Sequence, residues 1–101
     1  MTIDHLTAMS GRRPFLTALD EAVRERGGMS CGIVPRSGTP VLHVINTELP
    51  SRFTEISADF IGGAWVFTWA GTSDTISAAN APAIAAHAIA RTVGAHLGLR
   101  P

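Results

Sequence analysis

The stretch that decides the fold is Gly-Ala-Trp-Val-Phe-Thr-Trp-Ala-Gly-Thr-Ser-Asp-Thr-Ile, residues 63–76. Three aromatic residues alternate in it, at Trp65, Phe67 and Trp69. Because the side-chain period of a β-strand is two, the three rings share one face of a strand. The residues between them are small or apolar, and a strand that is apolar on both faces is typical of the middle of a sheet. The stretch therefore predicts a central strand whose rings are covered by a helix or a second sheet.

A helix is predicted before the sheet, at about Arg13–Arg26. Apolar residues recur there at helical spacing, and Pro14 suits a first turn, where a missing backbone N–H costs nothing. Gly27-Gly28 is expected to end this helix. Upstream, residues 1–12 are expected to form a flexible or only partly helical arm, which is either a dimer contact or without a role.

Three strands are predicted between this helix and the aromatic strand, at about Ser30–Arg36, Val41–Asn46 and Arg52–Phe60. Ser37-Gly38 suits the tight turn of a hairpin between the first two strands. Pro35 cannot donate to a strand ladder, so the first strand is expected at an edge of the sheet.

An Ala-rich C-terminal helix is predicted from Pro82 to about Leu97, with Gly98 ending it. Gly94 is unfavourable inside a helix, which suggests a close approach by another element. The predicted fold is thus α+β: a helix, a four-stranded antiparallel meander and a helix (α-β-β-β-β-α), forming a two-layer sandwich in one domain of residues 1–101. Two helices can cover one face of the sheet, so the apolar character of both faces predicts a homodimer.

Composition excludes some classes of partner. The 101 residues carry eight Arg and eight acidic residues, so the formal net charge is zero. Non-specific nucleic-acid binding needs clustered cations, and no nucleic-acid partner is expected. The N-terminus lacks the apolar core of a signal peptide, and the uncharged stretch Thr75–Ala90 is too weakly apolar to span a bilayer. We therefore expect a cytoplasmic protein without a membrane partner.

About two thirds of the chain resembles a set of small actinobacterial proteins of unknown function. The shared pattern, as it stands here, is Trp65-Val-Phe67-Thr-Trp69, then Ile76, then a Pro-opened helix containing Ala88-Ile-Ala-Arg91-Thr-Val-Gly94, with Pro40-Val-Leu-His-Val-Ile-Asn46 upstream. Members often carry acidic residues before the helix proline, where this chain has Asn80-Ala81. The order of elements is also similar to that of type III secretion chaperone-like folds, which are dimers that hold other proteins. These resemblances imply a fold and a binding role, and they carry over no catalytic residue.

Few residues suggest chemistry. The lone Cys31 gives neither a disulfide nor a cysteine zinc site, and no histidine pair has metal-ligand spacing, so no metal and no cofactor are expected. The candidates for binding a partner or ligand are three aromatic residues, two histidines and an arginine: Trp65, Phe67, Trp69, His43, His87 and Arg91. The three rings are either core packing or a groove for a ligand or partner.

The histidines each allow two interpretations. His87 and Arg91 are four residues apart on one helical face and are either a surface pair or a small site for a carboxylate or phosphate. His43 could act as a base only if Glu55 or Asp59 on the next strand oriented it, and no acid sits at a spacing that fixes its tautomer. We therefore predict that His43 is a satisfied or half-exposed strand histidine and not a catalytic base, and no catalytic residue is assigned.

Two functions remain open. The first is a non-enzymatic interaction protein, a dimeric adaptor or chaperone-like accessory that binds another protein or peptide, within a biosynthetic or regulatory gene cluster. The alternative is a small pathway enzyme or ligand-binding protein with a pocket between the aromatic strand and a helix, for which His43, Glu55, His87 and Arg91 are the polar candidates. A concave pocket favours the second, and a flat apolar patch favours the first.

Overall fold

The computed structural model describes residues 3–95, with side chains from Gly11 onward. The fold is α+β, and within this range it has two helices and five strands. In chain order they are α1 (Ile3–Arg26), β1 (Met29–Arg36), β2 (Thr39–Asn46), β3 (Phe53–Ile61), β4 (Ala64–Trp69), β5 (Thr75–Ala78) and α2 (Pro82–Val93).

The strands form one antiparallel meander in the order β1-β2-β3-β4-β5. The aromatic strand β4 lies between two neighbours, as predicted, and β1 lies at an edge. The meander has a fifth strand, β5, where the sequence predicted four. This strand has four residues, with Ile76 as its only large apolar side chain, and its pairing with β4 shifts register between Phe67 and Thr68. It therefore lacks the alternating pattern by which a strand is found in a sequence.

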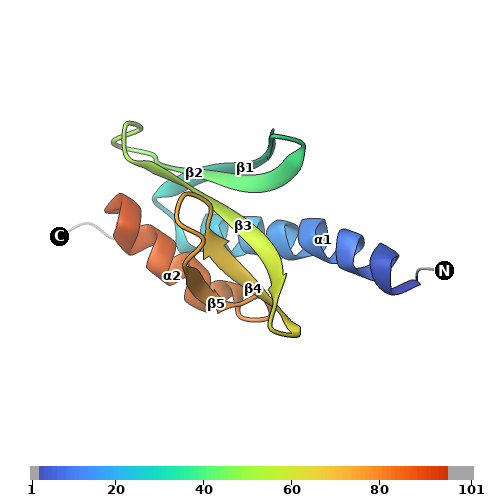
Figure 1. Ribbon diagram of the computed structural model, residues 1–101. Coiled ribbons are helices and arrows are strands. Elements are labelled where there is room, and N and C mark those ends of the chain that lie inside the picture. The colour runs from blue at the N-terminus through green and yellow to red at the C-terminus, as the bar shows by residue number, and fades with distance from the viewer. Residues whose placement is uncertain (1–2, 96–101) are drawn as a thin grey trace.

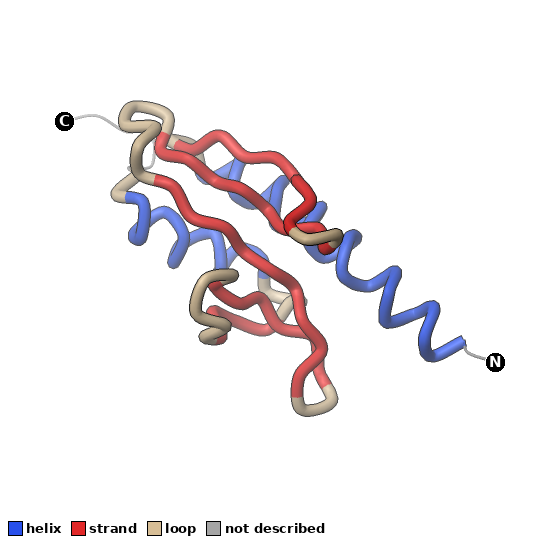
Figure 2. Tube along the Cα trace, turned by 45° about the horizontal axis from the view of Figure 1, so that its top comes forward, coloured by secondary structure: helices blue, strands red, loops and turns tan. Residues whose placement is uncertain are grey.

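Both helices pack on the same face of the sheet. Figure 1 shows α1 and α2 on one side, and Figure 2 shows the strands as a separate curved layer in front of them. The core between the layers joins α1 (Leu16, Leu19, Val23), the sheet (Met29, Leu42, Val44, Ile56, Ala58, Phe67), Ala79 directly after β5, and α2 (Ala85, Ala86, Ile89, Ala90, Val93). We call the other side of the sheet the open face.

Helix α1 begins ten residues before the predicted Arg13, because it starts at Ile3. Pro14 consequently lies inside the helix and not in its first turn. Two contacts just before the proline hold α1 against the sheet. A Cβ on Gly11 would lie 2.9 Å from Cε2 of Trp65, so α1 lies directly against this ring. The next residue, Arg12, donates a hydrogen bond to the sheet.

Helix α2 is opened by Pro82 as predicted, but it ends at Val93 and not near Leu97. Gly94 is its C-cap, with a φ of 70° in the left-handed region, where glycine is favoured. Leu97 and Gly98 lie outside the described residues. The predicted close approach at Gly94 is made by the Arg52 side chain.

A proline pair lies near the turn of the β1–β2 hairpin. Pro35 and Pro40 face each other across β1 and β2. The β2–β3 pairing is recorded from Leu42↔Ile56 to Ile45↔Phe53, and the same register would place Pro40 opposite Ala58. Since Pro40 has no N–H, it cannot donate to the Ala58 carbonyl. Nε of Arg12 donates to this carbonyl instead, at 2.7 Å, and so ties α1 to β3.

Candidate functional site

The open face carries apolar side chains on four strands. Side chains alternate along each strand, so those that do not point to the helices lie on the open face. Its apolar members are Val34, Val41, Ile45, Phe53, Ile61 and Val66. Phe53 and Ile61, at the two ends of β3, are 60% and 51% exposed. The open face is therefore more apolar than the solvent-exposed face of an antiparallel sheet usually is.

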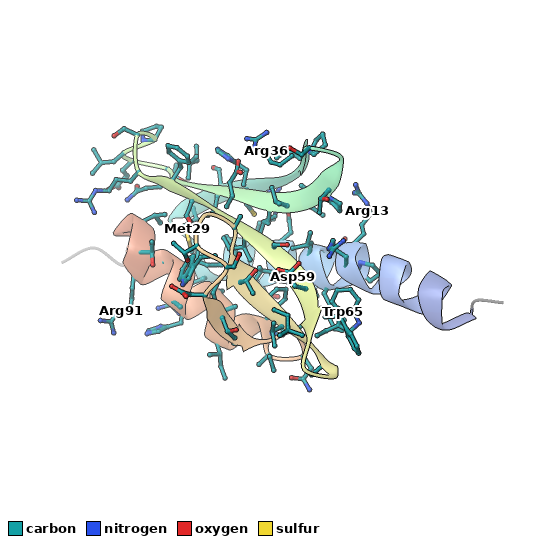
Figure 3. All side chains as sticks on the ribbon, viewed as in Figure 1. Arg13, Met29, Arg36, Asp59, Trp65 and Arg91 are labelled. Atoms are coloured by element: carbon teal, nitrogen blue, oxygen red, sulfur yellow. The ribbon has the colours of Figure 1, made fainter. Side chains whose placement is uncertain are left out.

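A polar cluster of Arg36, His43 and Glu55 lies on this face. The β2–β3 register pairs His43 with Glu55, and the ring Nδ1 lies 2.7 Å from Oε2. Arg36, at the end of β1, binds the same carboxylate with two nitrogens, at 3.0 Å from Nε and 2.5 Å from Nη2. The His43 ring stacks on Phe53, with 5.4 Å between centroids. Figure 3 shows Arg36 near the β1–β2 turn.

The cluster fixes the charge of Glu55 and the orientation of His43. Burial alone would raise the pKa of Glu55, but the hydrogen bonds from Arg36 and His43 outweigh burial, and this pKa is lowered. A carboxylate accepts hydrogen bonds, so the proton of a neutral His43 ring lies on Nδ1 and Nε2 is left as an acceptor. A histidine held in this way is able to accept a proton from a bound molecule.

Two hollows adjoin the cluster. The larger, of about 560 Å³, is lined by residues of β1, β2, β3 and the β4–β5 turn: Arg36, Val41, Phe53, Thr54, Glu55, Ala70 and Gly71. The smaller, of about 260 Å³, is lined by Ser30, Cys31, Gly32, Val34, His43 and Ile45. Both hollows involve the open face, and neither is the pocket between the aromatic strand and a helix that the alternative function would need.

One expectation about His43 is wrong. The sequence offered no acid at a spacing that fixes its tautomer, and the structure shows that Glu55 does so. Asp59, the other acid considered, has different partners: Arg12 at 3.2 Å, Ser57 at 3.2 Å and Thr68 at 2.7 Å. Asp59 lies in the middle of the sheet, away from Arg36 (Figure 3).

The aromatic candidates lie on the covered side. Phe67 is fully buried, and Trp65 and Trp69 are partly buried against the core. Trp65 lies 5.8 Å from Phe15 of α1 and 5.6 Å from Phe60 between ring centroids. Phe67 is therefore a core residue, and Trp65 and Trp69 pack against the core. A binding role for these rings stays a prediction.

The remaining candidates do not join the cluster. His87 and Arg91 are exposed on α2, so the sheet separates them from His43; Figure 3 shows Arg91 at the opposite side of the molecule from Arg36. His5 and His96 lie outside the residues whose side chains are described. The half-buried Cys31 faces α1, and burial raises the pKa of its thiol to about 12, so it is protonated at neutral pH.

Sequence reasoning missed Arg36 and Asn46. Arg36 joins the cluster only because β1 and β2 form a hairpin that brings it across β2 to Glu55. Asn46 is 4% exposed, and its Nδ2 donates to the Val93 carbonyl at the end of α2. An asparagine between a strand and a loop predicts a turn. It does not predict a hydrogen bond to Val93, which is 47 positions away in the sequence.

Within residues 3–95, no helix is long and apolar enough to cross a membrane. Among the side chains that the structure describes, from residue 11 to 95, no three of His, Cys, Asp or Glu lie together as a metal site. No protein-family model, curated protein or solved structure matches this chain. The similarities to actinobacterial proteins and to secretion chaperones therefore stay predictions, and the function has to be argued from the open face.

Proposed function

We propose that this chain is a non-enzymatic interaction protein that works as a homodimer, an adaptor or chaperone-like accessory for another protein or peptide. The observation that carries the proposal is the placement of both helices on one face of the sheet. The apolar side chains of the open face therefore pack against no described helix, and two of them, Phe53 and Ile61, are 60% and 51% exposed. Burying apolar surface is the main driving force of association, and a second copy of the chain is the partner that is always present.

The charges of the open face favour a second copy over a charged partner. Glu55 is neutralised by Arg36, and Asp59 by Arg12. Neither sign is in excess on these residues, so two open faces can meet without net repulsion. A surface made for an acidic or basic partner would carry an excess of one sign.

The sheet edges are poorly suited to pairing, which leaves the face as the contact. Pro35 removes one donor from the edge of β1. The Cys31 carbonyl on the same strand accepts a hydrogen bond of 2.7 Å from Arg24 of α1. At the other edge, β5 is only four residues long. Short edges, prolines and charged side chains at an edge all oppose strand-to-strand pairing.

The proposed dimer leaves apolar side chains for the adaptor's partner. Phe60, which contacts Trp65 on the helix side of the hairpin, is 56% exposed, and Ile84 on α2 is 63% exposed. Both point away from the open face, so a bound protein or peptide does not compete with the second copy.

Light scattering after size-exclusion chromatography tests the dimer. At micromolar concentration we expect twice the chain mass of 10.6 kDa. Ile45→Asp, on the open face beside Phe53, should give a monomer, while Thr92→Asp on the exposed side of α2 should stay dimeric. A wild-type protein that remains monomeric at the highest soluble concentration contradicts the proposal.

A ligand-binding protein or small enzyme is a second candidate, and one observation favours it. His43 is oriented by Glu55 at 2.7 Å, and Glu55 lines the hollow of about 560 Å³. Polar groups beside a concave apolar surface are typical of ligand sites. A fragment screen by two-dimensional NMR tests this candidate. Saturable shifts confined to the hollow, lost in Glu55→Gln and kept in Glu21→Gln on α1, would support it.

A further inference from the structure

The open-face residues of β3 are arranged symmetrically about Ser57. Two apolar side chains stand at the ends, an acid follows each of them, and Ser57 is the centre. In order they are Phe53, Glu55, Ser57, Asp59 and Ile61. If a second copy lies with its β3 antiparallel over this one, Phe53 faces the second Ile61 and each Glu55 faces an Asp59. Both acids already have an arginine partner in their own chain.

One end of this strand forms a projection. Ile61 is the last residue of β3, it precedes the turn Gly62-Gly63, and it is 51% exposed. Figures 1 and 2 both show the β3–β4 turn extending beyond the body of the sheet. Both glycines of the turn have positive φ, 63° and 84°, as a tight hairpin turn requires. The hairpin therefore presents a large aliphatic side chain on a short, ordered turn.

The other end of the strand lies beside a hollow. Phe53 and Glu55 line the cavity of about 560 Å³ together with Val41 and Ala70. Val41 is 5% exposed, so the hollow has a packed apolar wall. An aliphatic side chain is smaller than this open hollow, and in it the side chain would cover Phe53.

On the basis of the proposed homodimer, we infer that two copies pack open face to open face about a two-fold axis near Ser57. Each Ile61 then enters the hollow beside Phe53 of the other copy. The contact is isologous, because each chain supplies one projection and one hollow and the same contact forms twice. This places the dimer contact on β3 and explains why an isoleucine stands exposed at the tip of the β3–β4 hairpin.

A small-molecule ligand is the other occupant that the hollow allows. The second copy is favoured because the chain itself supplies an exposed side chain of suitable size at the symmetric end of the same strand. Glu55 and Asp59 are each paired with an arginine of their own chain, which reduces the repulsion between the facing acids. A ligand would leave Ile61 exposed.

Two single variants and their mixture test this contact. Ile61→Asp removes the projection, and Ala70→Trp fills the hollow; both sites are exposed, so the fold should tolerate both changes. Each variant should weaken dimerisation about 30-fold or more, the effect of losing a residue central to an interface. Ile84→Asp on α2 is the control and should dimerise like the wild type. Circular dichroism and thermal melting establish that each variant is folded, and Ile61→Ser replaces Ile61→Asp if the charge unfolds the hairpin.

The mixture separates this geometry from any other dimer. When Ile61→Asp and Ala70→Trp are combined, both changes fall on one of the two contacts, and the other contact has a native Ile61 and a native hollow. The mixed pair should therefore associate more tightly than either variant alone, which sedimentation velocity with one labelled partner measures. A wild-type monomer would overturn the proposed homodimer as a whole. A wild-type dimer that survives Ile61→Asp, or variants whose mixture shows no recovery, would overturn only this contact, as would a ligand that fills the hollow without weakening the dimer.

Discussion

His43 and Glu55 lie twelve positions apart in the sequence, and the structure joins Nδ1 of the first to Oε2 of the second at 2.7 Å. The same carboxylate is held by Arg36 from a third strand. One acid thus connects β1, β2 and β3 on a face that no described helix covers. Whether the open face binds a second copy or a ligand, this cluster gives it a fixed polar centre, since all three side chains restrain one another.

The cluster predicts how stability depends on pH. The pKa of Glu55 is lowered in the folded protein, so this carboxyl binds fewer protons folded than unfolded. It therefore stabilises the fold above its unfolded pKa of about 4.3, and this contribution is lost as the pH falls through the lowered folded value. Glu55→Gln should lower the free energy of unfolding at neutral pH. In this variant the free energy should also fall less steeply as the pH decreases. Urea unfolding across the acidic range measures both, with Glu21→Gln as the control that should follow the wild type.

Cys31 should react slowly in the folded protein. Burial, aided by the nearby Asp20, raises the pKa of its thiol to about 12, so almost no thiolate is present at neutral pH. Only the thiolate attacks a disulfide reagent. Ellman's reagent should label the native protein over hours and the urea-unfolded protein at once. Rapid labelling of the native protein would mean that the thiol is ionised or freely accessible.

A buried amide should be important for stability. Nδ2 of Asn46 donates to the Val93 carbonyl at 2.9 Å, and its Oδ1 accepts from the backbone N–H groups of Glu48 and Leu49 at 2.8 and 3.0 Å. Asn46→Ala leaves these groups without a side-chain partner, which should cost about 1–3 kcal/mol per group that stays buried. Chemical denaturation measures the loss. The exposed Asn80→Ala is the matched control, and an equal effect of the two changes would contradict this role.

The sequence predicted the elements that have a strong apolar period. Alternation in β4 and helical spacing in α1 and α2 were each sufficient to place the core, including the fully buried Phe67. It did not reveal β5, whose pattern is short and interrupted by a register shift, or the first ten residues of α1. Two of those residues, Gly11 and Arg12, contact Trp65 and the Ala58 carbonyl, and no local pattern contains these contacts.

The site was less predictable than the fold. Alternation correctly put Glu55 and Asp59 on one face of β3. Which of them meets His43 depends on the β2–β3 register, and hence on the conformation of the loop between the strands. A register shift of two residues would keep both acids on that face and pair His43 with another residue. The position of Arg36 depends in addition on the β1–β2 hairpin. The complete cluster therefore requires both the β1–β2 and the β2–β3 register, and neither can be read from the sequence.

The contact between α1 and the aromatic strand leads to the last prediction. A Cβ added at Gly11 would lie 2.9 Å from Cε2 of Trp65, closer than two such atoms can approach. The ring cannot move away easily, because Phe15 and Phe60 contact it. Gly11→Ala gains about 1 kcal/mol of helix propensity, but overpacking costs about 1–3 kcal/mol, so we expect a net loss of stability and a changed Trp fluorescence spectrum. Gly32→Ala on β1, where nothing lies within 4 Å of the added Cβ, is the control and should melt close to the wild type. If Gly11→Ala raises the melting temperature with an unchanged spectrum, α1 does not lie against Trp65 in solution.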